Sequence, residues 1–359
     1  MDVLLDGTPL LGVRTGIGQY VANLYGSLRA RPDVAPRLYS LTIRHGSRPA
    51  DVREGDWVHR RLPARALQRL WLAGDWPTAE LLLPRTQVLH ATNFTAPPTR
   101  RARRVATVHD LAFARLPETV HPQTRRAAAL TARQARHADA VITPSAAVGR
   151  EVAEHLGIPE ERVHVTPLGV TQEWFSAAPP PAAWRARHGV PADYLLAVGT
   201  REPRKNLPAL LEAHRAAGRN RVLPLVLVGP PGWGEEVRGD QDVVVLPYLA
   251  GEELRPLVAG AQALVFPSRY EGFGLPALEA LATGTPVLAN DIPVLREVLG
   301  DCGRYVDALD REALREALVT VSAAVDGPEE RRRRQSRAAT FTWSRCAEAT
   351  VAAYRAAGN

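Results

Sequence analysis

Residues 265–290 read VFPSRYEGFGLPALEALATGTPVLAN, and this stretch decides the fold. An apolar run ends near Phe266, a loop with Glu271 and two glycines follows, and an Ala- and Leu-rich segment starts at about Leu275. Pro276 is compatible with the first turn of a helix, where its missing N–H costs nothing. The pattern predicts a strand, a glycine loop and a helix whose free N–H groups point at a ligand. An anion is the natural ligand of such a helix start.

Two glutamates lie in this stretch, and their spacing bears on the chemistry. Glu279 follows Glu271 by eight residues, which is ~12 Å along a helix at about 1.5 Å per residue. The carboxylate pairs of glycoside hydrolases lie only about 5–9.5 Å apart. The spacing therefore favours two carboxylates that contact different parts of one long ligand.

Short β-branched runs alternate with longer segments of helical period along the chain. This alternation indicates parallel sheets covered by helices on both faces, and the number of strands is too large for one small sheet. We therefore predict an α/β protein with two Rossmann-like, doubly wound domains facing across a cleft. The predicted strands are Val3–Leu5, Gln87–His90, Val105–His109, Ala140–Pro144, Val163–Pro167, Tyr194–Gly199, Leu225–Gly229, Val243–Pro247, Ala263–Pro267 and Pro286–Asn290. The predicted helices include Gln123–His137, Leu207–Ala217 and Arg311–Ala324.

A proline-rich stretch marks the expected domain boundary. Residues 177–183 read AAPPPAA, which favours a stiff linker over a helix or strand. We place an N-terminal domain at residues 1–176 and a C-terminal domain at 184–343. Residues 344–359 have helical period and are expected to pack back on the N-terminal domain.

A second informative loop lies at residues 195–206, LLAVGTREPRKN. A strand breaks at Gly199, and Arg201, Arg204 and Lys205 follow it. The chain has 45 Lys and Arg residues, and Lys205 is its single lysine. Cations after a strand, beside a helix start, can clamp a diphosphate. A compact ammonium differs from a guanidinium fork, so we expect this lysine to have a specific task.

Composition excludes several classes of protein. The chain is 45% hydrophobic and 23% charged, with a net charge of +7, which is ordinary for a globular protein. Cys302 and Cys346 lie too far apart for a CxxC or zinc motif, which fits a reducing compartment. The start resembles no signal peptide, no apolar run is long enough to span a membrane, and no basic–aromatic module favours nucleic acid. We therefore expect a cytoplasmic protein.

The motifs allow two other interpretations. Gly272-x-Gly274-x-x-Ala277, with Asp291 after the next strand, fits the fingerprint of an NAD(P)-dependent oxidoreductase. However, residues 267–271 separate the strand from the first glycine, and the unit falls late in its domain. Asp240-Gln241-Asp242 resembles the Asp-x-Asp of metal-dependent transferases, but it precedes its strand and is therefore interpreted as a turn.

The motifs together resemble the retaining glycosyltransferases of family 4. The resemblance rests on EPRKN (202–206), EGFGLPALE (271–279) and GTPV (284–287), and it is closest to the mannosyltransferase-like branch. It extends over most of the chain through RTGIG (14–18), VHDLAF (108–113), TPSAAVGREV (143–152) and PLGV (167–170). It implies the GT-B fold, with the acceptor on the N-terminal domain and a nucleotide sugar on the C-terminal domain. Arg201 stands where a small apolar residue is more usual.

The resemblance also implies roles for individual residues. Glu271 would hold the hydroxyls of the donor sugar, and Glu279 would bind the ribose. Arg204 and Lys205 would neutralise the departing diphosphate, and His109 would hydrogen-bond the sugar. The remaining donor-binding residues would act through their backbone or through their lack of a side chain: Gly16, Gly18, Gly199, Phe273, Gly274 and Leu275.

The sequence thus predicts a retaining hexosyltransferase that uses a nucleoside diphosphate sugar, with mannose favoured, and that needs neither metal nor cofactor. The acceptor would be a hydroxyl of a glycan, glycolipid or lipid-linked molecule in cell-surface polysaccharide or glycoconjugate synthesis. Arg60–Leu72 combines arginines with Leu and Trp at helical spacing, so it is either a peripheral contact with the inner face of the membrane or a surface helix covering the sheet. A phosphorylase or a nucleotide-sugar epimerase of the same fold remains an alternative.

Overall fold

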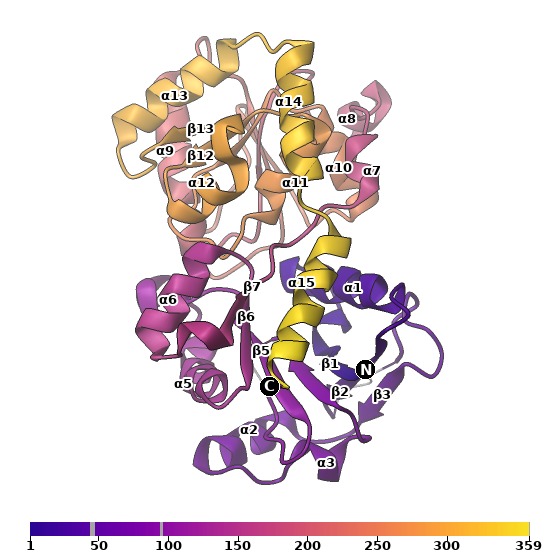
Figure 1. The fold of residues 1–359 in the computed structure, drawn as a ribbon. Helices are drawn as coiled ribbons and strands as arrows, with labels where there is room; N and C mark the ends of the chain where they lie inside the picture. Colours follow the sequence, from indigo (N-terminus) through magenta and orange to yellow (C-terminus); the bar gives the residue numbers. More distant parts are fainter. Residues whose placement is uncertain (44–46, 94–95, 359) are drawn as a thin grey trace. The chain divides into compact units, whose positions relative to one another are not determined.

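The computed structural model describes residues 1–43, 47–93 and 96–358, and of residues 122–128 the backbone. The chain divides into two compact units, which are described one at a time (Figure 1). Unit 1 comprises Met1–Phe113, Pro122–Gly169 and Thr342–Asn359, and unit 2 comprises Ala114–His121 and Val170–Phe341.

Unit 1 is built on a parallel sheet of seven strands in the order β3-β2-β1-β4-β5-β6-β7. The direction of winding changes between β1 and β4, so their carboxyl ends flank the topological switch point where α/β sheets bind ligands. The strands are β1 (Asp2–Asp6), β2 (Ala35–Leu41), β3 (Trp57–Arg60), β4 (Val88–Ala91), β5 (Arg103–Thr107), β6 (Ala140–Thr143) and β7 (Val163–Val165).

Helices cover both faces of this sheet. On one face, Leu4 and Leu89 pack with Leu67 and Trp71 of α2. The other face carries α1 and α15, which contact each other. The helices of unit 1 are α1 (Gly16–Arg29), α2 (Ala64–Ala73), α3 (Ala79–Leu82), α5 (Pro122–Arg136), α6 (Ala146–Leu156) and α15 (Trp343–Ala356), and α4 (Ala112–Arg115) crosses from unit 1 into unit 2.

Unit 2 repeats the plan with a parallel sheet of six strands in the order β10-β9-β8-β11-β12-β13. Its switch point lies between β8 and β11. The strands are β8 (Leu195–Val198), β9 (Leu225–Val228), β10 (Val243–Leu246), β11 (Ala263–Phe266), β12 (Val287–Asn290) and β13 (Gly303–Val306).

The inner strands of unit 2 (β8, β9, β11 and β12) are almost entirely buried, as parallel strands between two helical layers must be, whereas the edge strands β10 and β13 are partly exposed. Leu195 and Leu227 pack with Leu210 of α9 and Leu314 of α13. The glycine at the end of α11, Gly284, lies against α14, because a Cβ there would come within 2.4 Å of Arg331 Cγ. The helices are α7 (Gln172–Phe175), α8 (Ala182–His188), α9 (Leu207–Ala217), α10 (Gly251–Ala259), α11 (Leu275–Thr283), α12 (Pro293–Leu299), α13 (Arg311–Ala323) and α14 (Pro328–Ala339).

The division between the units differs from the one expected at residues 177–183. The chain passes from unit 1 to unit 2 after Gly169 and returns after Phe341. The prolines do not form a free linker, because Pro180 packs against Gly260, and α8 already begins at Ala182. Helix α15 belongs to unit 1, where it contacts α1 and β6.

The glycine of PLGV has a packing role at this crossing. A Cβ on Gly169 would lie 2.2 Å from the backbone nitrogen of Trp343. Only glycine therefore lets the outgoing and returning segments of unit 1 approach so closely.

Candidate active site

The candidate donor site lies at the switch point of unit 2. The loop after β8 carries Gly199, Arg204 and Lys205, and the loop after β11 carries Glu271. Because β8 and β11 are hydrogen-bonded neighbours, these loops meet although about 66 residues separate them. The structure thus brings together the two motifs that the sequence singled out.

Glu271 is the centre of this arrangement. Its Oε1 lies 2.6 Å from Lys205 Nζ, and its Oε2 lies 3.3 Å from Arg204 Nη1. The Glu271 side chain is 7% exposed and that of Lys205 12%. Burial alone would raise the pKa of Glu271, but the two cations outweigh it and hold that pKa below its usual value. Glu271 is therefore a buried carboxylate at neutral pH.

Arg204 connects Glu271 to a second buried carboxylate, Glu202. Arg204 Nη2 lies 2.8 Å from Glu202 Oε1, and Nη1 also donates to the carbonyl of Tyr270 at 3.1 Å. Burial raises the pKa of Glu202 against the opposing effect of Arg204 and Lys205. The cluster of Glu202, Arg204, Lys205 and Glu271 thus sets two cations against two carboxylates in a largely buried place.

The two loops are tied together by hydrogen bonds that the motifs did not predict. The backbone N–H of Arg269 donates to the carbonyl of Arg204 at 2.8 Å. Asn206 donates to the carbonyl of Ala308 at 2.9 Å, and the N–H of Ala308 donates to Asn290 at 2.9 Å. Asn290 in turn donates to the carbonyl of Ser268 at 2.9 Å. These bonds fix the loop of Lys205 relative to the loop of Glu271.

The start of α11 has the predicted geometry. Gly274 is the N-cap with a φ of 92°, a conformation that favours glycine, and a Cβ there would lie 2.8 Å from Leu295 Cδ2. The Phe273 ring is buried against Phe341, with centroids 5.8 Å apart. Phe273 can therefore offer a ligand its backbone but not its ring, and Leu275 contributes the first N–H of the helix.

Glu279 lies one turn further along α11 and is half-buried. Burial raises its pKa to about 8, against a smaller opposing effect of Arg255. Its carboxyl group is therefore largely protonated at pH 7 and can both donate and accept hydrogen bonds. A ribose, which offers hydroxyl groups rather than charge, suits such a group.

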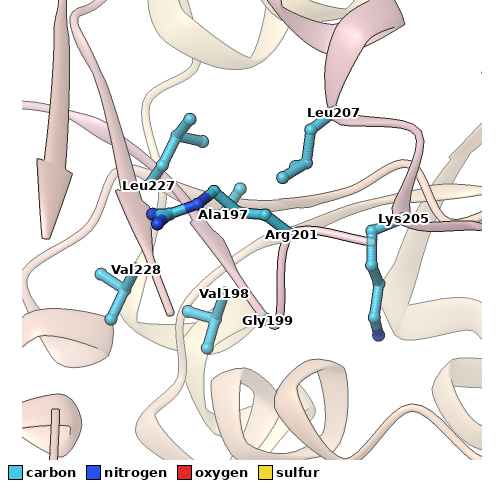
Figure 2. Close-up of a pocket in the computed structure, with 8 residues that line it drawn as sticks. All are labelled: Ala197, Val198, Gly199, Arg201, Lys205, Leu207, Leu227 and Val228. Carbon is cyan, nitrogen blue, oxygen red and sulfur yellow. The ribbon is translucent and has the colours of Figure 1, made fainter. Parts of the chain in front are cut away.

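Gly199 and Arg201 line a small pocket beside Lys205 (Figure 2). Gly199 has a φ of 151°, and a Cβ there would lie 3.3 Å from Lys205 Cε. Figure 2 shows the Arg201 side chain directed toward Leu227 and Val228 and away from Lys205. Arg201 Nη1 donates to the carbonyl of Gly229 at 3.3 Å, so this arginine is not part of the cation cluster.

In unit 1, His109 follows β5 at the carboxyl edge of the sheet and is half-buried. Its Nε2 lies 2.8 Å from the carbonyl of Thr92, which can only accept, so Nε2 carries a proton. Burial lowers the pKa of His109, and the bond to Thr92 and the charge of Asp110 oppose this only in part. The neutral ring thus keeps Nδ1 as a hydrogen-bond acceptor.

The two glycines of RTGIG differ in their surroundings. Gly16 is the first residue of α1, and no atom lies within 4 Å of where its Cβ would stand. A Cβ on Gly18 would lie 2.9 Å from the carbonyl oxygen of Pro9. The absence of a side chain at Gly18 thus serves the packing of α1, whereas Gly16 leaves the helix start open.

Two of the alternative interpretations can be compared with the geometry. Asp240 forms the predicted turn, since its Oδ1 accepts from the N–H groups of Asp242 and Val243. Asp291 is paired with Arg296, at 2.7 Å between Oδ2 and Nη2. Among the described residues, no group of three or more His, Cys, Asp or Glu side chains is arranged to hold a metal ion. Within residues 1–43, 47–93 and 96–358, no helix is long and apolar enough to cross a membrane.

Sequence reasoning missed Glu202, Asn206 and Asn290 as parts of the site. Glu202 and Asn206 flank the cations in EPRKN, so the motif itself was the available signal. Nothing in the sequence pointed to Asn290, because its role depends on the pairing of β11 with β12.

Comparison with known proteins follows the same division of the chain. Residues 192–323 match the family described as glycosyl transferases group 1, and residues 14–174 match glycosyltransferase family 4. The chain is 30% identical to O-antigen chain mannosyltransferase B of Escherichia coli over 99% of its own length and 100% of that protein. It is 33% identical to the MMP alpha-(1->4)-mannosyltransferase of Mycolicibacterium hassiacum, over 63% of this chain and 56% of that protein.

Solved structures show the same fold. Sucrose-phosphate synthase of Thermosynechococcus elongatus superposes with a TM-score of 0.71 at 20% identity, over 99% of this chain and 98% of that one. HepE of Anabaena in complex with UDP-glucose gives 0.69 at 16% identity, over 98% and 99%. WaaG, a glycosyltransferase involved in lipopolysaccharide biosynthesis, gives 0.67 at 17% identity, over 100% of both chains. These similarities confirm the predicted GT-B fold.

Proposed function

The chain belongs to the glycosyltransferases of family 4, and we propose that it moves a hexose, with mannose favoured, from a nucleoside diphosphate sugar to a hydroxyl of a glycan, glycolipid or lipid-linked acceptor. The observation that carries this proposal is the buried Lys205–Glu271 pair beside the start of α11. The choice of mannose is supported by the names of two relatives, each a mannosyltransferase.

The donor reaction places negative charge where this site holds cations. The bond between the anomeric carbon and the diphosphate oxygen breaks, and its electron pair goes to the diphosphate. Lys205 and Arg204 stabilise that charge together with the N–H groups at the start of α11. Glu271 accepts hydrogen bonds from the sugar hydroxyls, and Glu279 binds the ribose. No metal ion is required, because fixed cations neutralise the leaving group.

Retention of configuration follows from attack on the face that the diphosphate leaves. The acceptor oxygen bonds to the anomeric carbon, and the acceptor proton passes to the departing diphosphate oxygen. Glu271 is a positioning group rather than a covalent nucleophile, because Lys205 and Arg204 hold both of its oxygens. A glycosyl adduct on Glu271, trapped in the wild-type enzyme and absent from Glu271→Gln, would overturn this assignment.

His109 is proposed to accept a hydrogen bond from a donor-sugar hydroxyl through Nδ1. Its neutral state and its fixed bond to Thr92 support this role. Gly16, at the open start of α1, is proposed to let the backbone approach the phosphates.

The donor is identified by thermal-shift measurements with UDP-, GDP-, ADP- and dTDP-sugars, followed by assays of product formation with candidate acceptors. We expect one nucleotide sugar to raise Tm, and Lys205→Ala to remove most of the rise. Turnover without consumption of an acceptor hydroxyl would instead indicate a phosphorylase or an epimerase. If no nucleotide sugar raises Tm, the donor-site assignment is wrong.

A lipid-linked acceptor is supported by the surface around α2. The helix begins at Ala64. Its Leu67 and Trp71 cover the sheet, so on this face it is the surface helix that the sequence allowed for Arg60–Leu72. Its other face is exposed, with Leu70 at 44%, Leu72 at 42% and nearby Trp76 at 63%. The same segment carries four exposed arginines, Arg60, Arg61, Arg65 and Arg69. Apolar and basic groups together suit a surface of anionic lipid.

Co-sedimentation with vesicles of phosphatidylcholine, with and without phosphatidylglycerol, tests this contact. We expect binding to the anionic vesicles alone, and its loss in the double variant Arg65→Ala/Arg69→Ala. The matched control is Arg150→Ala/Arg332→Ala, which removes the same charge from exposed positions elsewhere. Equal binding by both double variants would refute a specific contact through α2.

A further inference from the structure

A buried chain of hydrogen bonds runs through the sheet of unit 1 and ends beside His109. Tyr354 of α15 lies 2.6 Å from Nδ1 of His90 on β4. Nε2 of His90 lies 2.7 Å from the hydroxyl of Thr107 on β5. The Thr107 hydroxyl lies 3.1 Å from that of Tyr20 on α1. These three hydrogen bonds join side chains of α15, β4, β5 and α1.

All four side chains are at most 5% exposed. Burial lowers the pKa of His90 to about 3, and it raises the pKa values of Tyr20 and Tyr354. These four side chains are therefore uncharged at neutral pH, and each is held by a directional hydrogen bond to its neighbour. A buried polar network of this kind fixes side-chain geometry as long as every member keeps its partner.

The end of the chain contacts the proposed sugar-binding histidine. The rings of Tyr20 and His109 lie 5.0 Å apart with an interplanar angle of 83°, an edge-to-face contact. His109 is held at its other side by the Thr92 carbonyl. Two contacts thus determine the direction of its Nδ1: one hydrogen bond and one aromatic face.

We propose that Tyr20 is a positioning residue for His109, and that the Thr107–His90–Tyr354 chain holds the Tyr20 ring in the orientation that His109 requires. This inference rests on the proposed role of His109. It also gives helix α15 a role in the reaction, because Tyr354 of α15 is the end of the hydrogen-bond chain opposite to Tyr20. Nothing in this arrangement requires Tyr20 to touch the substrate.

The test is a double-mutant cycle with His109→Ala. Tyr20→Leu removes the ring and is expected to lower kcat about 10- to 100-fold, since small displacements of reacting groups carry costs of this order. Tyr20→Phe keeps the ring but loses the bond of its hydroxyl to Thr107, so kcat should fall less than in Tyr20→Leu, by about 3- to 5-fold. In the His109→Ala background, Tyr20→Leu should change kcat by less than about 3-fold, because its target is gone. The KM for the nucleotide sugar should change less than kcat in the Tyr20 variants.

Tyr25→Leu is the matched control. Tyr25 is a buried tyrosine of the same helix, but its hydroxyl donates to Asp56 at 2.6 Å and not to Thr107. The Tyr25→Leu variant should lower Tm as Tyr20→Leu does, but its kcat should equal that of the wild type. Should Tyr25→Leu reduce kcat as much as Tyr20→Leu, the effect is one of general stability and the inference fails.

Tyr354→Phe tests the far end with little risk to folding. It removes one hydroxyl, and it should shift the imidazole resonance of His109, identified by its loss in His109→Ala. Tyr25→Phe should leave that resonance in place.

If His109→Ala keeps the wild-type kcat, the proposed role of His109 is wrong and the inference falls with it. If His109→Ala lowers kcat but Tyr20→Leu acts equally in both backgrounds, only the positioning role is wrong.

Discussion

Replacing Lys205 by methionine should affect stability and catalysis separately, and the structure sets the size of both effects. Lys205 Nζ lies 2.6 Å from Glu271 Oε1, and both side chains are largely buried. Removing one partner of a buried pair costs about 3–5 kcal/mol, because the other charge stays behind. Arg204 still faces Glu271 at 3.3 Å, so we expect the lower end, about 3 kcal/mol. For a unit of this size, that is a fall in Tm of roughly 6–12 °C.

The catalytic effect has a different origin. Lys205 is the closest cation to Glu271, and in the proposed reaction it faces the departing diphosphate. Losing one preorganised group that stabilises a developing charge lowers kcat by about 10²–10³-fold. Lys205→Arg should also lower kcat, by roughly 10-fold. The Cε of Lys205 lies 3.3 Å from where a Cβ on Gly199 would stand, and a longer side chain with a planar guanidinium would place its charge elsewhere than the ammonium does.

The double variant Lys205→Met/Glu271→Gln separates the two effects. It removes both charges together, so it should recover most of the lost Tm and none of the lost kcat. Calorimetry and steady-state kinetics on the wild type, both single variants and the double variant complete the experiment. A kcat for Lys205→Met within 3-fold of the wild type would show that the ammonium does not stabilise the leaving group. A double variant no more stable than the single ones would show that the pair is not coupled.

Three further changes test other parts of the donor site. Burial raises the pKa of Glu279 from 4.5 to about 8, so the folded state loses stability as the pH rises through this window and the buried carboxyl group ionises. Chemical unfolding should therefore show Glu279→Gln as stable as the wild type at pH 4.5. At pH 8 the variant should be more stable, by about 1–3 kcal/mol after allowance for partial exposure. Asn206→Ala should lower kcat about 10-fold by releasing the Lys205 loop, whereas Asn206→Gly, which tolerates the φ of 57°, should recover the stability but not the kcat. Gly274→Ala should raise the KM of the donor and lower Tm, because φ is 92° and Leu295 lies 2.8 Å from the new Cβ, whereas Gly26→Ala, where the space is open, should do neither.

The sequence predicted most strands of both sheets, and those it missed share physical features. β2 contains Pro36, a residue that usually argues against a strand inside a sheet. β3 and β13 are edge strands of four residues with half-exposed side chains, so neither shows a continuous apolar run. Ser145 is the N-cap of α6, since its Oγ accepts from the N–H of Val148 at 3.2 Å; a serine directly before an Ala-rich segment is typical of such a cap.

The candidate site was predictable residue by residue but not as a network. Lys205 and Glu271 stood out because each follows a strand in a distinctive motif. Their contact depends on the adjacency of β8 and β11, and local sequence patterns do not encode strand order. The division between the units, after Gly169, depends on distant contacts in the same way. Three prolines indicate a stiff segment, but whether such a segment packs on a domain depends on distant residues, here Gly260.

The charge balance of the cluster has a further consequence for binding. Two carboxylates already occupy the two cations, so a nucleoside diphosphate must compete with Glu271 for Lys205 and Arg204. A donor sugar offsets this competition, because its hydroxyls donate to Glu271 while the diphosphate takes the cations. Glu271→Gln removes the competing charge and replaces one of the two acceptor oxygens that face the sugar by an NH2 donor. We therefore expect this variant to bind the bare nucleoside diphosphate more tightly than the wild type, by about 3- to 10-fold, and to lose kcat with the complete donor. Calorimetric titration with both ligands measures the difference, and weaker binding of the nucleoside diphosphate by Glu271→Gln would show that Glu271 does not compete for the cations.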